Sequence, residues 1–599
     1  MEMRKTKIVC SCGPACANDE TIKQMILAGM NVARFNFSHG DHNTQKEAMD
    51  RVKRVSAELG IPVALLLDTK GPEIRTGIVK DDGLITLKAG MKVEVTVDGT
   101  ECTNEENGKP CHISLSWKDA PNKLKQGHKI LIADGLIELV VDEIKNGTIY
   151  TTCSNDGKIG SKKNVNLIGV HAGLPIMAEN DKSDIAFGVT QDVDFIAASF
   201  VSFPEEVVEI KNYLHSLGSK AKIIAKIENE EGLNNIEKIV KEADGIMVAR
   251  GDLGVQLPTE KIPLAQKKII RECHNQGKTV ITATQMLDSM IVNPRPTRAE
   301  LTDVSNAVFD GTDAVMLSGE TANGKYPVEA VKMMSLITST TEQSAEYIQR
   351  MRDIDGTTFV PGTEVGHMVT HSAYKLAKNI EAKAIVIPTL RGNTARMVSS
   401  FRPEQVVLAV TPDKKTQRQL LLCWGVVPIL TETVTESESM IQNAIKVSID
   451  NKMLNMGDRI VMCAGIPLAS PLMANTIKVL IVGNILARGT RFGFNDARIT
   501  KATGRVLHAD VVFDHQEKIR VNRHTILVTD TITEDLIPIL RVVDGVVSEN
   551  GSEIDESTLK LVNPTLIWIK NAPNAVKNLE NDLSVTIDGK EGLVYEGTV

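Results

Sequence analysis

Two short apolar stretches, each followed by charged residues, decide the fold of this chain. Residues 222–228 read Lys-Ile-Ile-Ala-Lys-Ile-Glu, and residues 245–252 read Gly-Ile-Met-Val-Ala-Arg-Gly-Asp. Both have the length and composition of buried parallel strands, and a helix-length segment separates them. Because ligands bind at the carboxyl ends of parallel strands, we expect Lys226, Glu228 and Asp252 to meet at a binding edge.

The residue types at this edge indicate an anionic, phosphate-bearing substrate and a hard metal ion. Carboxylate oxygens are typical ligands of such ions, and a lysine attracts phosphate. A purely structural ion-pair network among the same three side chains is the alternative, since such networks also gather at strand ends. The spacing alone leaves both interpretations open.

The composition excludes several classes of partner. The chain has 599 residues, enough for three or four domains, and a net charge of -8 without any Lys/Arg-rich run. We therefore expect no nucleic-acid partner and no membrane anchor. The longest apolar run, residues 471–486, contains Lys478 and is no membrane span. The amino terminus lacks the long apolar part of a signal peptide, so we predict a cytoplasmic protein.

The nine cysteines are an odd number and are mostly scattered, which favours free thiols over a disulfide framework. Cys10, Cys12 and Cys16 form a cluster that could bind a metal. No fourth ligand lies nearby, and Cys10 and Cys12 fall on one face of a predicted strand. Buried core thiols are the favoured interpretation.

The whole chain predicts an α/β fold built on a (β/α)8 TIM barrel. Eight strand-like runs alternate with helix-length segments, as that barrel requires. About 125 residues separate the third run from the fourth, far more than a βα unit needs, so a module is inserted there. The runs are residues 7–12, 32–37, 63–68, 195–201, 222–227, 245–249, 279–284 and 313–317.

The remaining segments predict three further domains. Residues 71–170 alternate short strands with glycine turns, which indicates a small β-barrel or sandwich acting as a lid over the barrel formed by residues 1–70 and 171–352. Residues 353–487 show a second, doubly wound α/β pattern. A linker at residues 488–495 leads to a C-terminal domain at residues 500–599.

Four more motifs stand at predicted strand ends. Residues 31–40 read Asn-Val-Ala-Arg-Phe-Asn-Phe-Ser-His-Gly, and residues 67–75 read Leu-Asp-Thr-Lys-Gly-Pro-Glu-Ile-Arg. Residues 282–287 read Thr-Ala-Thr-Gln-Met-Leu, and residues 316–321 read Met-Leu-Ser-Gly-Glu-Thr. Together with the first two segments, and in this order, they resemble pyruvate kinase over residues 1–485. Six ordered matches are far more specific than any one of them.

The resemblance implies an allosteric phosphotransferase that moves the phosphoryl group of phosphoenolpyruvate to ADP. The products are pyruvate and ATP, in the last step of glycolysis, and the enzyme is a homotetramer. Positive charge must surround the migrating group, which suits Lys226 and Arg34. The peptide N–H groups of Gly251 and Asp252 would hold the substrate carboxylate, with Thr284 on its other face. By resemblance, Glu228 and Asp252 bind Mg2+ or Mn2+, and the catalytic residues are Lys226, Arg34, Thr284, Ser318 and Glu320.

The resemblance also implies a monovalent cation site and a nucleotide site. Cation-dependent members have Glu at the position of Glu73, and independent members have Lys. Capping and turn formation are the alternative role of the cation ligands, and simple solvation is the alternative for the nucleotide residues. The K+ ligands by resemblance are Asn36, Ser38, Asp68 and Thr69, and the nucleotide residues are Arg75, Lys163 and His39.

A phosphate nest for an effector is predicted after a strand of the second α/β domain, where hydroxyls, a glycine and backbone N–H groups open a helix. An ordinary βα turn is the alternative. The effector would be a phosphorylated sugar or a nucleotide, but the second effector loop, residues 468–474, lacks the family's glycines. The predicted effector residues are Thr389, Arg391, Gly392, Asn393, Thr394 and Arg396.

The last hundred residues resemble the swivelling phosphohistidine domain of phosphoenolpyruvate-using enzymes. The corresponding segment, residues 549–557, contains no histidine, so we expect no phosphotransfer through this domain. Two other functions remain as alternatives for the whole chain. One is a metal-dependent barrel lyase or aldolase acting through an enolate, and the other is a catalytically silent sugar-phosphate sensor.

Overall fold

The computed structural model describes residues 4–105, 110–354, 365–434, 437–466, 474–483, 485–493, 500–514 and 521–597. They fall into two compact units. The first comprises Met1–Tyr374, Ile387–Thr433 and Ala464–Asn475, and the second comprises Lys375–Val386, Val434–Cys463 and Thr476–Val599.

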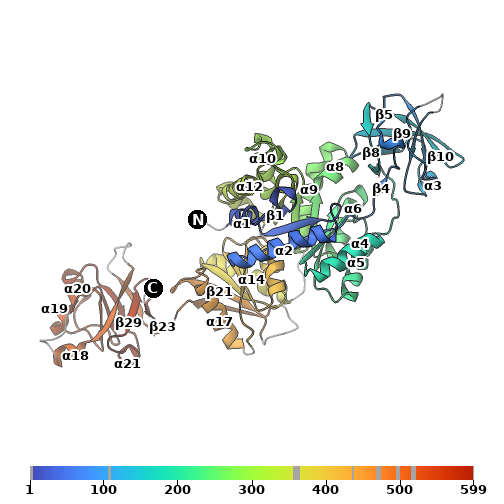
Figure 1. The fold of residues 1–599 in the computed structure, drawn as a ribbon. Coiled ribbons are helices and arrows are strands. Elements are labelled where there is room, and N and C mark those ends of the chain that lie inside the picture. The colour runs from blue at the N-terminus through green and yellow to red at the C-terminus, as the bar shows by residue number, and fades with distance from the viewer. Residues whose placement is uncertain are drawn as a thin grey trace. The chain divides into compact units, whose positions relative to one another are not determined.

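A closed parallel barrel forms the centre of the first unit (Figure 1). Each strand pairs with the next in the ring, and β1 pairs with β17 to close it. All eight strands predicted from apolar runs are confirmed, and three residues is the largest difference at a strand end. The strands are β1 (Lys7–Ser11), β2 (Val32–Asn36), β3 (Ala64–Asp68), β13 (Phe195–Ala198), β14 (Lys222–Ile227), β15 (Gly245–Ala249), β16 (Thr279–Ala283) and β17 (Ala314–Leu317).

Two layers of apolar side chains hold the barrel together. One fills its interior, with Ala64, Ile224 and Met316 among its members, and the other lies between the strands and the surrounding helices. Alternate residues of each strand face the two layers, so the strands are apolar over most of their length. The helices are α1 (Asp19–Ala28), α2 (His42–Leu59), α4 (Glu179–Thr190), α5 (Pro204–Ser216), α6 (Glu230–Asn234), α7 (Ile236–Glu242), α8 (Arg250–Gln256), α9 (Ile262–Asn275), α10 (Arg298–Phe309), α11 (Gly319–Ala322), α12 (Pro327–Glu342) and α13 (Ala345–Ile354).

The inserted segment between β3 and β13 is a mainly β module with its own apolar core and the short helix α3 (Ala120–Lys123). Seven strands form one sheet, in the order β4-β12-β8-β9-β10-β6-β7. Its two edges are joined at Thr76 and Leu115, where Gly77 N donates to Ser114 O and Ser116 N donates to Arg75 O. The sheet thus curls back on itself as a small barrel. Its strands are β4 (Ile74–Arg75), β6 (Lys92–Thr96), β7 (Cys111–Ser114), β8 (Lys129–Ile132), β9 (Ile137–Lys145), β10 (Thr148–Cys153) and β12 (Asn164–Leu167), with β5 (Ile85–Leu87) and β11 (Gly157–Ile159) in a separate ribbon.

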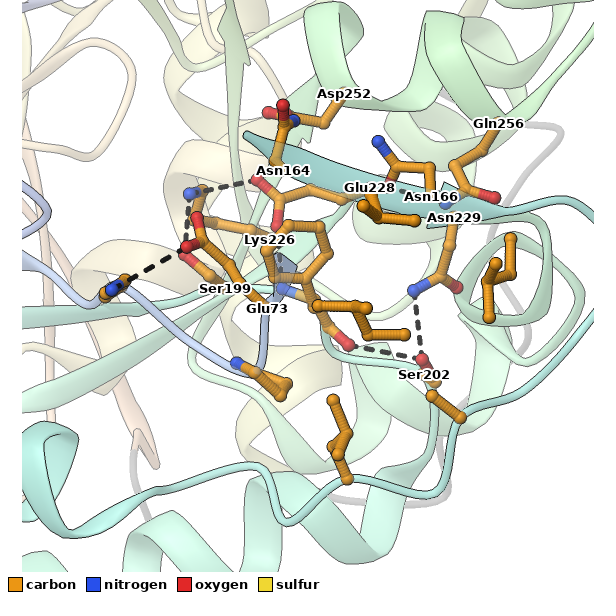
Figure 2. Close-up of a pocket in the computed structure, with 18 of the residues that line it drawn as sticks. Glu73, Asn164, Asn166, Ser199, Ser202, Lys226, Glu228, Asn229, Asp252 and Gln256 are labelled. Carbon is orange, nitrogen blue, oxygen red and sulfur yellow. Dashed lines mark hydrogen bonds and ion pairs between the residues drawn. The ribbon is translucent and has the colours of Figure 1, made fainter. Parts of the chain in front are cut away.

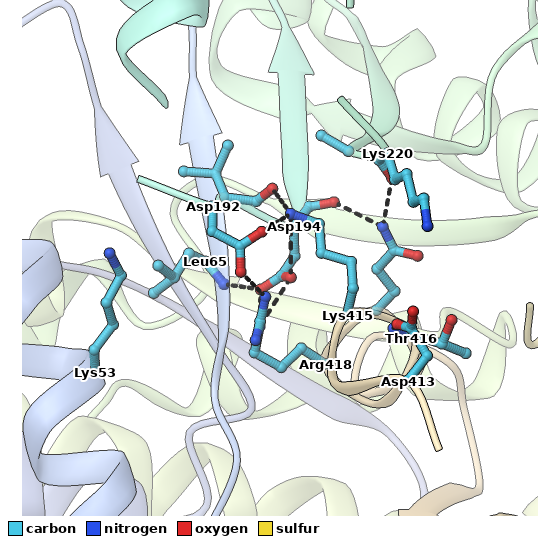
Figure 3. Close-up of polar contacts among 12 residues, drawn as sticks. Lys53, Leu65, Asp192, Asp194, Lys220, Asp413, Lys415, Thr416 and Arg418 are labelled. Carbon is cyan, nitrogen blue, oxygen red and sulfur yellow. Dashed lines mark hydrogen bonds and ion pairs between the residues drawn. The ribbon is translucent and has the colours of Figure 1, made fainter. Parts of the chain in front are cut away.

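Helix α16 (Lys414–Leu420) is bound to the amino-terminal end of the barrel by an ion-pair network (Figure 3). Arg418 donates to both carboxylate oxygens of Asp194 at 2.9 Å, and Lys415 lies 2.7 Å from Asp192. Asp194 also accepts the N–H of Leu65 in β3. Leu421 and Leu422, which follow the helix, belong to the apolar cluster inside the barrel.

A second polar cluster at this end surrounds Arg402, which is almost fully buried. Its guanidinium lies 2.8 Å from Asp313 and over the ring of Trp424. The same group donates to the carbonyl of Gly311, and it lies 2.6 Å from Nε2 of His274, which is itself 2.7 Å from that carbonyl oxygen. Burial, and then the charge of Arg402, lower the pKa of His274 to about 4. The imidazole is therefore neutral.

The second α/β pattern is also confirmed. In the first unit, β19 (Val406–Thr411) pairs in parallel with β20 (Val426–Leu430), and α15 (Asn393–Ser400) precedes them. Strand β18 (Ala384–Pro388) pairs in parallel with β21 (Arg459–Ala464). The other elements of this pattern are α14 (Val365–Asn379), α17 (Ser437–Asp450) and β22 (Thr476–Ile481).

An eight-stranded mixed sheet forms the C-terminal part of the second unit. It includes β23 (Ile485–Arg488) and β24 (Thr490–Gly493), which pair with β30 and β28. The sequence had assigned these residues to the end of the preceding domain and to a linker; both strands are too short to stand out from a polar connection. The other strands are β25 (Lys501–His508), β26 (Thr525–Thr529), β27 (Gly545–Ser548), β28 (Ile567–Lys570), β29 (Ser584–Asp588) and β30 (Leu593–Glu596), with helices α18 (Ala509–Asp514), α19 (Ile537–Leu540), α20 (Glu556–Val562) and α21 (Ala575–Asn578).

Two expectations from composition can be compared with this structure. All nine cysteines are free thiols, as predicted. Among the described residues, none of the helices combines the length and the apolar character needed to cross a bilayer.

The pKa of His274 predicts how stability depends on pH. The folded-state pKa of about 4 lies below the ordinary value of 6.5, so the unfolded chain binds more protons between these values. Stability should fall as pH drops from 6.5 towards 4, by about 3 kcal/mol from this residue alone. His274→Gln, which offers Arg402 an acceptor but does not titrate, should lose less stability over this range in urea unfolding. His215→Gln, at an exposed position, is the control, and equal pH dependence in all three proteins would contradict the assignment.

Candidate active site

A pocket of about 950 Å³ lies at the carboxyl ends of the barrel strands (Figure 2). Its wall combines barrel residues such as Lys226, Glu228 and Asp252 with Asn164 and Asn166 of the inserted module. The predicted convergence of the lysine and the two carboxylates is therefore observed.

Lys226 lies at the centre of the site, with its ammonium group surrounded by oxygen atoms. Its Nζ atom lies 3.0 Å from a carboxylate oxygen of Asp68 and 2.9 Å from one of Glu228. It also donates a 2.7 Å hydrogen bond to the hydroxyl of Ser199. Arg34 extends the network, because its Nε donates to the other carboxylate oxygen of Asp68 at 2.6 Å.

Burial and charge act in opposite directions on these groups. Burial disfavours the charge on Lys226, but Asp68 and Glu228 outweigh it and raise the pKa of the ammonium. Burial likewise disfavours the charge on Asp68, but Arg34 and Lys226 outweigh it and lower the pKa of that carboxyl. For Glu228, burial outweighs the attraction of the Lys226 ammonium. Together with the nearby charge of Asp252, burial raises the pKa of Glu228 to about 7. Of these three groups, Glu228 is the one whose burial outweighs its oppositely charged partner.

Glu228 and Asp252 are the residues that could hold a divalent ion. Glu228 follows β14, and its other oxygen accepts the N–H of Phe200 at 2.7 Å. Asp252 stands in the first turn of α8, and Figure 2 shows its side chain beside that of Glu228. Two carboxylates on an open polar pocket fit Mg2+, which uses oxygen ligands and keeps several waters.

The turn around Thr284 is strained and closely packed. Thr284 has φ +73°, a conformation that a β-branched residue rarely adopts. A Cβ atom on Gly251 would lie only 2.7 Å from Cγ2 of Thr284, so a glycine is required for α8 to approach this turn. Neither Gly251 nor Thr284 lines the pocket.

The predicted K+ ligands lie together but already have partners. Asn36 Oδ1 accepts the N–H of Ser38 at 3.0 Å, and the hydroxyl of Thr69 donates to Ala197 O. Asn36, Ser38 and Thr69 line the pocket, whereas Asp68 lies behind them, bound to Arg34 and Lys226. Both the turn-forming and the cation-binding interpretation fit this geometry.

The predicted nucleotide residues Arg75, Lys163 and His39 all line the pocket. Arg75 is paired with Glu73 at 2.5 Å, and Lys70 lies 3.8 Å from the same carboxylate. Glu73 also lines the pocket, so a negative charge lies beside the two basic residues. The sequence did not reveal this pairing.

Ser318 and Glu320 do not line the pocket. The carboxylate of Glu320 is buried and accepts the N–H groups of Leu287 and Ser318 at 3.0 and 2.7 Å. These bonds join the loops after β16 and β17. In this structure Glu320 positions neighbouring loops, and its predicted part in proton transfer stays a prediction.

Comparisons with known proteins identify relatives of this chain. The profile of the pyruvate kinase barrel domain matches residues 3–331, and that of the pyruvate kinase alpha/beta domain matches residues 367–480. Pyruvate kinases of Staphylococcus aureus strains MRSA252 and USA300 are 42% and 41% identical over 597 residues, covering 99% of this chain and 99% of each relative. A crystal structure of a pyruvate kinase from Cryptosporidium parvum is 39% identical, with TM-score 0.75, over 80% of this chain and 96% of that one.

The chain belongs to the pyruvate kinase family. It is an enzyme of that family, and the long C-terminal part also has a counterpart in the Staphylococcus aureus relatives, because the match spans almost both full lengths.

The predicted effector loop of this pyruvate kinase is closed by its own contacts. Gly392 has φ +75° and donates its N–H to the hydroxyl of Thr389 at 2.9 Å. Arg396 donates to the carbonyl of Arg391 and to the side chain of Asn393, and Thr394 is buried at the start of α15. These are contacts of a βα turn, and effector binding remains a prediction. The second effector loop falls almost entirely on residues 467–473, outside the described residues.

Three contributors to the site were not found from the sequence. Ser199 and Phe200 follow β13, where they bind Lys226 and Glu228, and Ser11 ends β1, where it accepts a 2.7 Å hydrogen bond from Arg34. Their position at strand ends was a usable signal for Ser199 and Ser11. Phe200 acts through its backbone N–H at φ +60°, which side-chain chemistry does not reveal.

The contact between α8 and Thr284 predicts that replacing Gly251 by alanine lowers turnover far more than the same replacement of Gly254. Gly251→Ala should displace Thr284 or α8, which carries Asp252, and lower turnover at least tenfold, because a misplacement of about 1 Å can cost roughly a hundredfold in rate. Gly254→Ala is the matched control in the same helix, since its Cβ would meet only Ile262 Cδ1 at 4.0 Å. Equal steady-state turnover of the two variants would contradict the role given to this contact.

Proposed function

We propose that this chain transfers the phosphoryl group of phosphoenolpyruvate to ADP, giving pyruvate and ATP, with Mg2+ or Mn2+ and K+ as cofactors. This is the last step of glycolysis, and nine free thiols suit the reducing cytoplasm. The single observation that carries the proposal is the ammonium of Lys226, held between Asp68, Glu228 and Ser199 beside Arg34.

Lys226 and Arg34 would provide the positive charge that phosphoryl transfer needs. The transition state spreads negative charge over the equatorial oxygens, and fixed cations stabilise it without further reorganisation. Lys226 is 9% exposed and held by three partners, so its position is set before the substrate arrives. A divalent ion bound by Glu228 and Asp252 would supply Lewis-acid charge to the substrate oxygens.

The other side chains would orient the two substrates. The peptide N–H groups of Gly251 and Asp252 at the start of α8 would bind the carboxylate of phosphoenolpyruvate, with Thr284 across from them. Arg75, Lys163 and His39 would contact the nucleotide, and Asn36, Ser38, Asp68 and Thr69 would hold K+. Ser318 and Glu320 would assist protonation of the enolate, Glu320 through the loops that it joins.

We also propose regulation by a phosphorylated sugar or nucleotide at the loop after β18, in a homotetramer. The support is the family membership together with hydroxyls and arginines at the start of α15. The C-terminal domain, without a histidine in residues 549–557, is proposed to carry no phosphoryl group.

Pyruvate formation followed through lactate dehydrogenase tests the main proposal. Activity should require phosphoenolpyruvate, ADP and a divalent ion together. A lyase or aldolase would turn over without ADP, and a silent sensor would show no turnover, so either result contradicts the proposal.

Lys226→Met should lower turnover at least a hundredfold, because it removes a fixed cation from the transition state. Glu228 and Asp252 remain, so Mn2+ binding measured by electron paramagnetic resonance should survive. Lys222→Met is the matched control, since Lys222 opens the same strand and pairs with Asp244 away from the pocket. Near-normal turnover of Lys226→Met would refute its assigned role.

The K+ requirement depends on Glu73 in this proposal. Full-length protein should be inactive or nearly so in tetramethylammonium salts with Mg2+, and active in K+ at matched ionic strength. Glu73→Lys should lessen the requirement and keep measurable turnover, because an ammonium group there partly replaces the bound cation. Glu73→Gln is the control, which removes the acid without adding a cation and should stay K+-dependent. Full activity of the unaltered enzyme without K+ would overturn the cation site.

A further inference from the structure

The residues that follow β1 bring two thiols together. Residues Pro14–Cys16 form a 3-10 turn, in which Cys16 N donates to Gly13 O and Gly13 N donates to the sulfur of Cys16 at 3.3 Å. That nitrogen is two bonds from Cα of Cys12. The Cys16 sulfur therefore lies within about 6 Å of Cα of Cys12, from standard backbone dimensions. A disulfide needs the two Cα atoms to lie about 4.4–6.8 Å apart, so a sulfur this close to Cα of Cys12 comes within reach of its thiol when the loop moves.

The two thiols also interact directly. Each thiol is the largest influence on the pKa of the other, and both side chains pack on the cluster between the strands and helices of the barrel. Cys16 is 2% exposed, whereas Cys12 is half-buried and Pro14 of the turn is exposed. The pair thus lies under a thin loop at the carboxyl end of the barrel.

The surroundings of Cys16 lower the pKa of its thiol. The neighbouring thiol of Cys12 is the largest influence, and burial opposes it. The N–H of Gly13 and the charge of Arg51 lower the pKa further, to about 7. Since the thiolate is the reactive form, Cys16 has nucleophilic character at neutral pH.

We propose that Cys12 and Cys16 form a redox-active dithiol that a hydroperoxide converts to an intrachain disulfide. The thiolate of Cys16 attacks the terminal oxygen of the peroxide, the O–O bond breaks, and an alkoxide or hydroxide leaves and takes a proton. Cys16 is then a sulfenic acid. The sulfur of Cys12 attacks the sulfur of Cys16, the S–O bond breaks, and water leaves with the Cys12 proton. Two electrons pass from the two thiols to the peroxide, and a reducing dithiol reverses the change.

The loop that carries the pair is connected to two parts of the candidate active site. Cys12 N donates to Arg34 O, and Ser11 accepts the guanidinium of Arg34 at 2.7 Å. On the other side, Thr321 donates to Ser11 O, and a Cβ on Gly13 would lie 2.6 Å from Ala322 O. Closing a disulfide here must displace this tightly packed loop, so the position of Arg34 should change and turnover should fall.

Cys10 is the nearest competing thiol, and the structure disfavours it. It is fully buried within β1, and burial is the main cause that raises its pKa well above the ordinary value. Within the described residues, no group of three His, Cys, Asp or Glu side chains could hold a metal ion.

Peptide mapping of the full-length enzyme tests the site without any variant. Trypsin releases residues 8–23, which contain Cys10, Cys12 and Cys16. After hydrogen peroxide and denaturing alkylation without reductant, this peptide should carry one alkyl group, on Cys10, and lack two hydrogen atoms. Fragmentation should show no backbone breaks between Cys12 and Cys16. Three alkylated thiols, sulfonic acids, or a bridge to Cys10 would overturn the proposal.

Activity provides a second readout. Oxidised enzyme should lose at least fivefold in turnover and recover with dithiothreitol. Cys12→Ser and Cys16→Ser should keep basal turnover within twofold and become insensitive to reversible inactivation, whereas Cys10→Ser should stay sensitive. Reversible inactivation of Cys16→Ser equal to that of the unaltered enzyme would show that another thiol is responsible. The peptide map stays decisive if a serine variant does not fold.

Discussion

The buried ammonium of Lys226 is the interaction on which the rest of the site depends. A buried charge is tolerated only when oppositely charged and hydrogen-bonding groups surround it, and here they come from different strands. Asp68 ends β3, Ser199 follows β13 and Glu228 follows β14. These three strands are neighbours in the barrel, with Phe195 opposite both Leu66 and Lys222. The register of the sheet and the position of the charge therefore constrain each other.

The opposite end of the barrel is held by a similar principle. Asp194 lies just before β13, and its carboxylate receives both Arg418 of α16 and the N–H of Leu65 in β3. Burial raises the pKa of Asp194 and the bound arginine opposes this. An ion pair thus lies at each end of the neighbouring strands β3 and β13: Asp68 with Lys226 at the carboxyl end, and Asp194 with Arg418 at the amino-terminal end. The contacts at the amino-terminal end fix the strands whose other ends present Asp68 and Ser199 to the pocket.

The sequence predicted those parts of the fold that local pattern determines. Strands buried on both faces are continuous apolar runs, so β14 and β15 were found with correct ends, and the convergence of Lys226, Glu228 and Asp252 followed. The pairing of Asp68 with Arg34 did not follow, because it depends on which strands become neighbours. Phe200 was missed because its contribution is a backbone N–H, which any residue but proline provides. The short strands β23 and β24 were missed because only their partners in the C-terminal sheet make them strands.

The charges at the site bear on the proposed reaction. Arg34 and Lys226 both form ion pairs with Asp68. Lys226 also pairs with Glu228, and Asp252 places a third carboxylate nearby. Within this cluster three acids outnumber two bases, and the charges of Asp252 and Asp68 add to burial in raising the pKa of Glu228. A phosphorylated carboxylate would add several more negative charges. In the proposed reaction, a divalent cation held by Glu228 and Asp252 would offset this charge when such an anion binds. The proposed cation site would thus share Glu228 with the network that holds Lys226 in place.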